Sequence, residues 1–80
     1  MKDEKDFVIQ CEGDINRLYE EVYTLGNEKH TLCKVELVTK EAVLQLVAPL
    51  GIYNRLIDNT HVYVEYARKG SIILYAEVIE

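Results

Sequence analysis

The stretch that decides the expected fold is residues 14–26, which read Asp-Ile-Asn-Arg-Leu-Tyr-Glu-Glu-Val-Tyr-Thr-Leu-Gly. Apolar residues recur in it at spacings of three and four, namely Ile15, Leu18, Tyr19, Val22 and Tyr23. Such spacing places them on one stripe of an amphipathic helix. Asp14 is a suitable N-terminal cap, and Gly26 suits the left-handed conformation that ends many helices. The pattern therefore predicts a helix over residues 15–25.

The segments on either side of this helix alternate between apolar and polar residues, which is typical of strands. Residues 7–12 place Phe7, Ile9 and Cys11 on one face. Residues 31–38 do the same with Cys33, Val35 and Leu37. Two strands joined by a helix favour a parallel, right-handed crossover.

Residues 39–58 leave two interpretations open. A second helix over residues 40–48 would stop before Pro49, because a proline restricts the conformation of the residue that precedes it. In the alternative, residues 42–48 form a strand; their incomplete alternation favours the helix. A further helical segment is expected over residues 50–58.

The C-terminal residues predict a β-hairpin made of residues 61–67 and 72–79. A three-residue loop that ends at Gly70 pairs Tyr66 with Ile72, which puts the most apolar rows of the two strands on one face. The opposite face then carries Tyr63, Ile73 and Tyr75, together with Glu65 and Glu77.

The expected order is therefore β-α-β-α-β-β. It corresponds to an α+β two-layer sandwich, with one open mixed four-stranded sheet and the helices on one face. A chain of 80 residues fits a single domain spanning residues 1–80, of which residues 1–5 are expected to form a flexible tail.

Composition excludes several classes of protein. The nine Lys and Arg residues against fourteen Asp and Glu residues leave a net charge of −5, which disfavours a protein that neutralises phosphates. No apolar run approaches the ~18 residues of a membrane span, and no apolar stretch follows the charged N-terminus as in a signal peptide. We therefore expect a cytoplasmic protein. Cys11 and Cys33 are too few for a disulfide scaffold and are expected to be buried thiols.

The residues needed for common chemistries do not occur in the required patterns. Ser71 is the only serine and has no histidine near it in the sequence. The two His and two Cys residues lack the short spacings of a metal site, apart from a weak His30 to Cys33 pair. No glycine-rich loop precedes a helix, as phosphate binding would need. The sequence predicts no enzyme, no metal and no cofactor.

The outer face of the expected sheet is the one candidate site. A solvated sheet face is normally polar, whereas this one keeps large apolar and aromatic residues of the types enriched at interfaces. The predicted partner-binding residues are Tyr63, Tyr75, Ile73, Glu65 and Glu77. They predict a small acidic interaction protein (an inhibitor, adaptor or regulatory subunit). It would dock on a basic surface of another protein, such as a nucleic-acid- or anion-binding surface, or on a second copy of itself.

The expected order of elements resembles that of the Alba-type chromatin domain and of the C-terminal domain of translation initiation factor three. This resemblance implies nucleic-acid binding through basic residues around the first helix and on a hairpin arm. The first-helix positions hold acids (Glu12, Asp14, Glu20 and Glu21), whereas the hairpin tip keeps Arg68 and Lys69. A further alternative is a small oligomeric enzyme or ligand-binding protein with a site between subunits.

Overall fold

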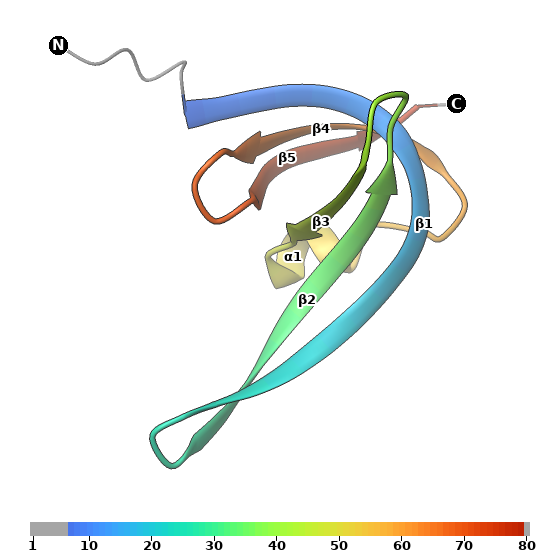
Figure 1. Ribbon diagram of the computed structural model, residues 1–80. Coiled ribbons are helices and arrows are strands. Elements are labelled where there is room, and N and C mark those ends of the chain that lie inside the picture. Colours follow the sequence, from blue (N-terminus) through green and yellow to red (C-terminus); the bar gives the residue numbers. More distant parts are fainter. Residues whose placement is uncertain (1–6, 80) are drawn as a thin grey trace, which may run out of the picture.

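The computed structural model describes residues 7–79 and shows a closed β-barrel (Figure 1). The elements are β1 (Val8–Leu25), β2 (Glu28–Val38), β3 (Val43–Val47), α1 (Leu50–Tyr53), β4 (His61–Ala67) and β5 (Ile72–Val78). The order around the barrel is β1-β2-β3-β5-β4. Strands β3 and β5 are parallel, and the other neighbouring pairs are antiparallel. Because β4 returns beside β1, the connectivity is a Greek key.

The expected α+β sandwich is therefore wrong. Residues 15–25 continue β1 instead of forming a helix, and β1 and β2 are antiparallel rather than parallel neighbours. The helix expected over residues 40–48 is also wrong, because β3 occupies this segment as in the alternative interpretation. The helical segment expected over residues 50–58 is confined to α1. The tail expected over residues 1–5 lies outside the described residues.

A bulge in β1 accounts for the helix-like spacing of three between Ile15 and Leu18. Ile15 pairs with Leu37 and Arg17 pairs with Glu36, so Asn16 is an extra residue in the ladder. A bulge shifts the alternation of the residues that follow it. Ile15 and Leu18 therefore both face the barrel interior, although they are three residues apart. The β-branched and aromatic residues of this segment also favour a strand.

The core fills the inside of the barrel. Its buried members are Ile15, Val35, Leu37, Leu46, Ala48, Leu56, Val62, Val64, Tyr66 and Ile73. Close approach of β1 to β2 requires Gly13, because a Cβ atom at this position would lie 2.5 Å from the carbonyl oxygen of Val38.

Within residues 7–79, no helix has both the length and the apolar character needed to cross a membrane.

The β4–β5 hairpin exists, but its expected register is wrong. Tyr66 pairs with Ile73, and residues 68–71 form the loop, in which Gly70 and Ser71 have φ angles of 81° and 53°. Glu65 pairs with Tyr75, so the residue between these two pairs, Leu74, is a bulge. Ile73 therefore points into the core, and the bulge returns Tyr75 to the outer face.

Strands β1 and β2 continue past the barrel as a two-stranded ribbon, which Figure 1 shows as the long hairpin in cyan and green. The β1–β4 ladder ends at Asp14, whereas the β1–β2 ladder runs on to Leu25 and Glu28. We call residues 17–36 the arm: residues 17–25 of β1, their partners 28–36 in β2, and the turn between them. The base of the arm still belongs to the barrel wall, because residues 34–36 also pair with β3; the remainder is two-stranded.

Candidate functional site

The outer surface of β4 and β5 carries two tyrosines and two glutamates in a checkerboard. Tyr63 lies opposite Glu77, and Glu65 lies opposite Tyr75. The side chain of Tyr75 is 47% exposed and Glu77 is exposed, whereas Tyr63 and Glu65 are half-buried. We call these four residues the acidic tyrosine patch; all four lie on the outer face, as the sequence predicts.

Hydrogen bonds fix the geometry of this patch. The hydroxyl of Tyr63 donates to Oε2 of Glu65 at 2.6 Å, and the hydroxyl of Tyr75 donates to Oε1 of Glu77 at 2.9 Å. The two rings meet edge to face, with centroids 6.3 Å apart and an interplanar angle of 64°. Edge-to-face contact is a favoured arrangement of aromatic pairs. Each tyrosine therefore orients the carboxylate two residues further along its own strand.

The two carboxylates also raise the pKa values of the tyrosine hydroxyls. The hydrogen bond to Glu65, with smaller effects of burial and neighbouring charge, raises the pKa of Tyr63 to about 12. The hydrogen bond to Glu77 is the largest cause of the raised pKa of Tyr75, whereas Arg55 acts in the opposite direction. Both hydroxyls thus stay neutral donors beside the two carboxylates, and the patch presents negative charge to its surroundings.

Ile73, the remaining predicted partner-binding residue, is not part of this surface. Its side chain is fully buried, because the bulge at Leu74 turns it into the core. Strand β1 contributes residues that the sequence analysis did not include. Glu12 pairs with Tyr63 and Gln10 pairs with Glu65, so both extend the same outer face. Their polar positions in residues 7–12 were visible in the sequence, but the adjacency of β1 and β4 was not.

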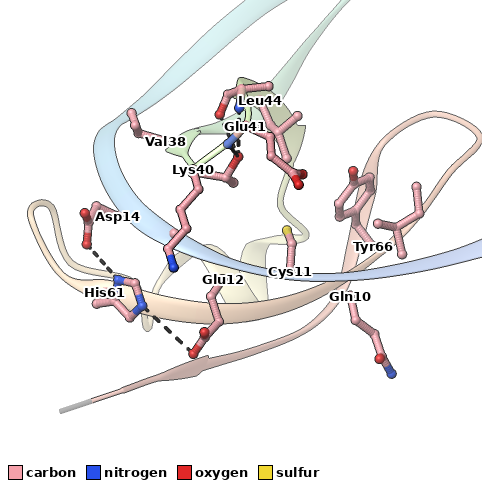
Figure 2. Close-up of a pocket in the computed structure, with 14 residues that line it drawn as sticks. Gln10, Cys11, Glu12, Asp14, Val38, Lys40, Glu41, Leu44, His61 and Tyr66 are labelled. Carbon is pink, nitrogen blue, oxygen red and sulfur yellow. Dashed lines mark hydrogen bonds and ion pairs between the residues drawn. The ribbon is translucent and has the colours of Figure 1, made fainter.

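A groove of about 730 Å³ lies between β1 and the turn that joins β2 to β3 (Figure 2). Partly buried or buried residues on its floor are Ile9, Cys11, Leu44 and Tyr66. On its rim, Nδ1 of His61 lies 2.8 Å from Oδ1 of Asp14, and Nε2 of His61 lies 3.9 Å from Oε2 of Glu12. The two ring nitrogens of His61 therefore face the carboxylates of Asp14 and Glu12.

The groove does not present an activated nucleophile. Burial raises the pKa of the Cys11 thiol, which disfavours the reactive thiolate. Both cysteines are free and partly buried. Within residues 7–79, no group of three or more His, Cys, Asp and Glu side chains is placed to hold a metal ion.

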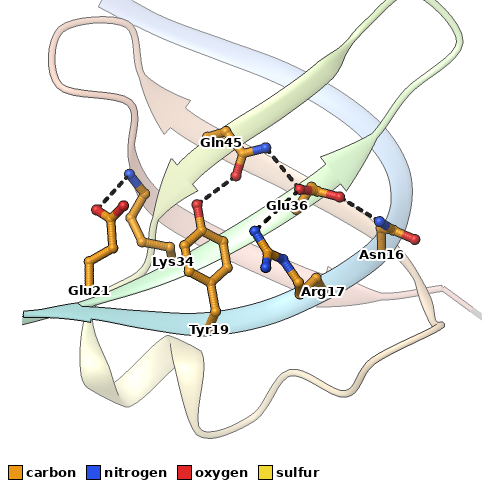
Figure 3. Close-up of polar contacts among 7 residues, drawn as sticks. All are labelled: Asn16, Arg17, Tyr19, Glu21, Lys34, Glu36 and Gln45. Carbon is orange, nitrogen blue, oxygen red and sulfur yellow. Dashed lines mark hydrogen bonds and ion pairs between the residues drawn. The ribbon is translucent and has the colours of Figure 1, made fainter.

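A second polar surface covers the outside of β1, β2 and β3, and Glu36 lies at its centre (Figure 3). Glu36 accepts hydrogen bonds from Gln45 at 3.0 Å and from Asn16, and Arg17 lies 3.8 Å away. The hydrogen bond from Gln45 is the largest cause of the lowered pKa of Glu36. Tyr19 donates to Gln45 at 2.7 Å.

The cations on this surface are also engaged within the chain. The guanidinium of Arg17 lies 4.2 Å from the ring centroid of Tyr19, and Lys34 lies 3.5 Å from Glu21. Few charged groups therefore remain there for a ligand, whereas the carboxylates of the acidic tyrosine patch have no cation within salt-bridge distance among the described residues.

Comparisons of the chain with protein-family models, with curated proteins and with solved structures found no match.

Proposed function

We propose that this protein is a small acidic interaction protein that docks the acidic tyrosine patch on a basic surface of another protein. The observation that carries the proposal is the pair of carboxylates, Glu65 and Glu77, each held by a tyrosine and unpaired with a cation. A carboxylate oriented in this way is suited to accept charge-assisted hydrogen bonds from arginine. The tyrosine rings beside them add the apolar contact area that interfaces favour.

The charge of the whole chain supports the same partner. A net charge of −5 attracts a basic protein over a distance and speeds the encounter. Glu12 and Gln10 enlarge the polar rim around the two tyrosines. The partner surface that fits best is therefore rich in arginine, such as one that itself binds nucleic acid or another anion.

The test uses a synthetic peptide of alternating arginine and serine, titrated into the labelled protein and followed by NMR. We expect the largest shift changes at the amides of β4 and β5. The double variant Glu65→Gln with Glu77→Gln should weaken binding by about 0.5–2 kcal/mol in total, since an exposed ion pair contributes about 0.2–1 kcal/mol.

A matched control removes the same charge elsewhere. The double variant Glu20→Gln with Glu28→Gln changes the net charge by the same two units. Both residues lie in the arm, away from the acidic tyrosine patch, so this variant should weaken binding less. Equal weakening by both double variants would show attraction to net charge alone and would contradict the proposed site. The variant Tyr63→Ala with Tyr75→Ala should also lose binding while its circular dichroism spectrum stays that of the wild type.

Nucleic-acid binding is the alternative that the barrel itself raises. Five-stranded Greek-key barrels of the OB class bind oligonucleotides through strands 2 and 3 and the loops that join strands 1–2 and 4–5. In this chain the corresponding face has Glu36 at its centre, and its cations Arg17 and Lys34 are engaged with acids. Architecture alone does not assign a function. Tight, salt-sensitive retention of single-stranded RNA or DNA on a filter would favour this alternative.

Binding of a small molecule is a third candidate function, and the groove of about 730 Å³ favours it. Ligand sites usually enclose about 300–1,000 Å³ and combine an apolar floor with a few polar groups. A thermal-shift screen of metabolites tests it. A true ligand should lose its effect in Leu44→Glu, which places a charge on the groove floor.

A further inference from the structure

We propose that the arm joins two copies of this chain by pairing the free edge of β1 with the same edge of a second copy. The proposal concerns a different surface from the acidic tyrosine patch and does not depend on it.

The edge of β1 opposite β2 is unpaired along the arm. Ile15 still exchanges backbone hydrogen bonds with Thr60 and Asn59, at 2.9 and 2.8 Å. Beyond it, no described strand pairs with residues 17–25 on this side. Unpaired strand edges are templates for adding another strand. The free edge of β2 is shorter, because Ala48 already donates to the carbonyl of Cys33 at 2.8 Å.

The arm also exposes large apolar side chains to solvent. The exposed fractions of Val22, Tyr23 and Leu25 are 64%, 40% and 65%. A two-stranded ribbon is marginally stable alone, and a third or fourth strand stabilises it. Pairing of two arms would produce a four-stranded sheet, in which these side chains gain cross-strand neighbours on their own faces.

The nearly neutral charge of the arm permits a second copy as the occupant, and the self-matching register described below favours it. The arm holds three cations (Arg17, Lys29 and Lys34) and four acids (Glu20, Glu21, Glu28 and Glu36), a net charge of −1. The rest of the chain then carries −4 of the total of −5. Repulsion between two copies is therefore weakest where their arms meet, whereas a strongly basic partner is attracted more strongly to the acidic tyrosine patch.

The ladder geometry specifies the register. In an antiparallel pair, the backbone groups of successive residues point to alternate sides of the strand. The carbonyl of Cys33 points to β3, so the backbone of Thr31 also points away from β1. Val22 is the β1 partner of Thr31, and the backbones of such a pair point away from each other. The N–H and C=O of Val22 therefore point to the free edge of β1.

A two-fold axis at Val22 gives a register without opposed like charges. Val22 of each copy then lies opposite the other, with Tyr19 opposite Leu25, Glu20 opposite Thr24, and Glu21 opposite Tyr23. An axis at Glu20 would oppose two glutamates, which destabilises a sheet. The symmetric pairing is closed, as in most homodimers.

Light scattering at increasing protein concentration tests the proposal. The molar mass should rise from 9.3 kDa toward twice that value. Val22→Pro removes the N–H at the axis and should raise the dissociation constant about tenfold or more, since symmetry removes two hydrogen bonds at once.

Thr31→Pro is the matched control, because it removes an outward N–H from the partner position in β2 and leaves the β1 edge intact. It should remain dimeric, as should Val22→Thr, which keeps the N–H. A wild-type protein that stays monomeric, a Val22→Pro variant that dimerises as tightly as the wild type, or an equal loss of affinity in Val22→Pro and Thr31→Pro would overturn the proposal. The variant Glu65→Gln with Glu77→Gln should dimerise like the wild type, so failure of the docking function and failure of the dimer are distinguishable.

Discussion

At the scale of single residues, the distinctive feature is a tyrosine hydroxyl that donates to a glutamate two positions later on the same strand. This arrangement occurs twice, in Tyr63 with Glu65 and in Tyr75 with Glu77. Alternate residues of a strand share a face, so the spacing of two brings the groups together. Exposed bonds of this kind contribute little to stability, and their main effect is to hold the carboxylates in place.

The raised pKa of Tyr63 predicts a dependence of stability on alkaline pH. Its pKa is about 12 in the folded protein and about 10 in an unfolded chain, so the folded state holds the proton more tightly. The stabilisation is fully present below pH ~10 and is lost as the pH rises toward ~12. Urea unfolding at successive pH values should show this fall in the wild type. It should be smaller in Tyr63→Phe and unchanged in Tyr23→Phe; a fall of the same size in Tyr63→Phe would contradict the assignment.

At the scale of elements, two bulges decide which residues are buried. The extra residue Asn16 brings both Ile15 and Leu18 to the inside of β1. The extra residue Leu74 brings Ile73 inside and leaves Tyr75 outside β5. A bulge changes the alternation at one point only, so strict alternation holds on either side of it.

The bulge in β5 predicts that substitutions at two adjacent residues change stability by very different amounts. Ile73→Ala should lower the free energy of unfolding by about 2–5 kcal/mol, because it leaves a cavity in the core. Leu74→Ala, at a side chain that is 55% exposed, should change it by only about 0.5 kcal/mol. Denaturant unfolding of the two variants measures both values. The register expected from the sequence requires the reverse order, so the pair of variants separates the two.

At the scale of the whole molecule, the barrel closes through very little hydrogen bonding. Strands β3 and β5 pair only at Val47 and Ile72, and the closing bond runs from the N–H of Val47 to the carbonyl of Ser71 at 2.8 Å. The ladders of β1 with β2 and of β4 with β5 are much longer. The seam between β3 and β5 is therefore the weakest part of the barrel wall.

Native-state hydrogen exchange should reveal this seam within one strand. Leu46 pairs with Val35 in β2, and its amide should be protected. Gln45 points its backbone to the opposite side, where β5 has already diverged, so its amide should exchange faster. The amide of Val47 should fall between them. Equal protection of Leu46 and Gln45 would mean that the wall is closed along all of β3.

The sequence by itself determined the local features that depend on alternation. It predicted strands at residues 7–12, 31–38, 61–67 and 72–79, and it placed Tyr63, Glu65, Tyr75 and Glu77 on one outer face. These features follow from the period of two along a strand, which requires no knowledge of the neighbouring strand.

Only the tertiary structure decided the features that depend on a partner strand. An amphipathic helix and a bulged strand can show the same spacing over residues 15–25, and it is pairing with β2 that selects the strand. β3 becomes a strand because β2 pairs with it, although its own alternation is incomplete. Ile73 is buried because of a bulge that arises only in the ladder with β4. In each case the hydrogen bonds that outweigh local preference come from residues distant in the sequence.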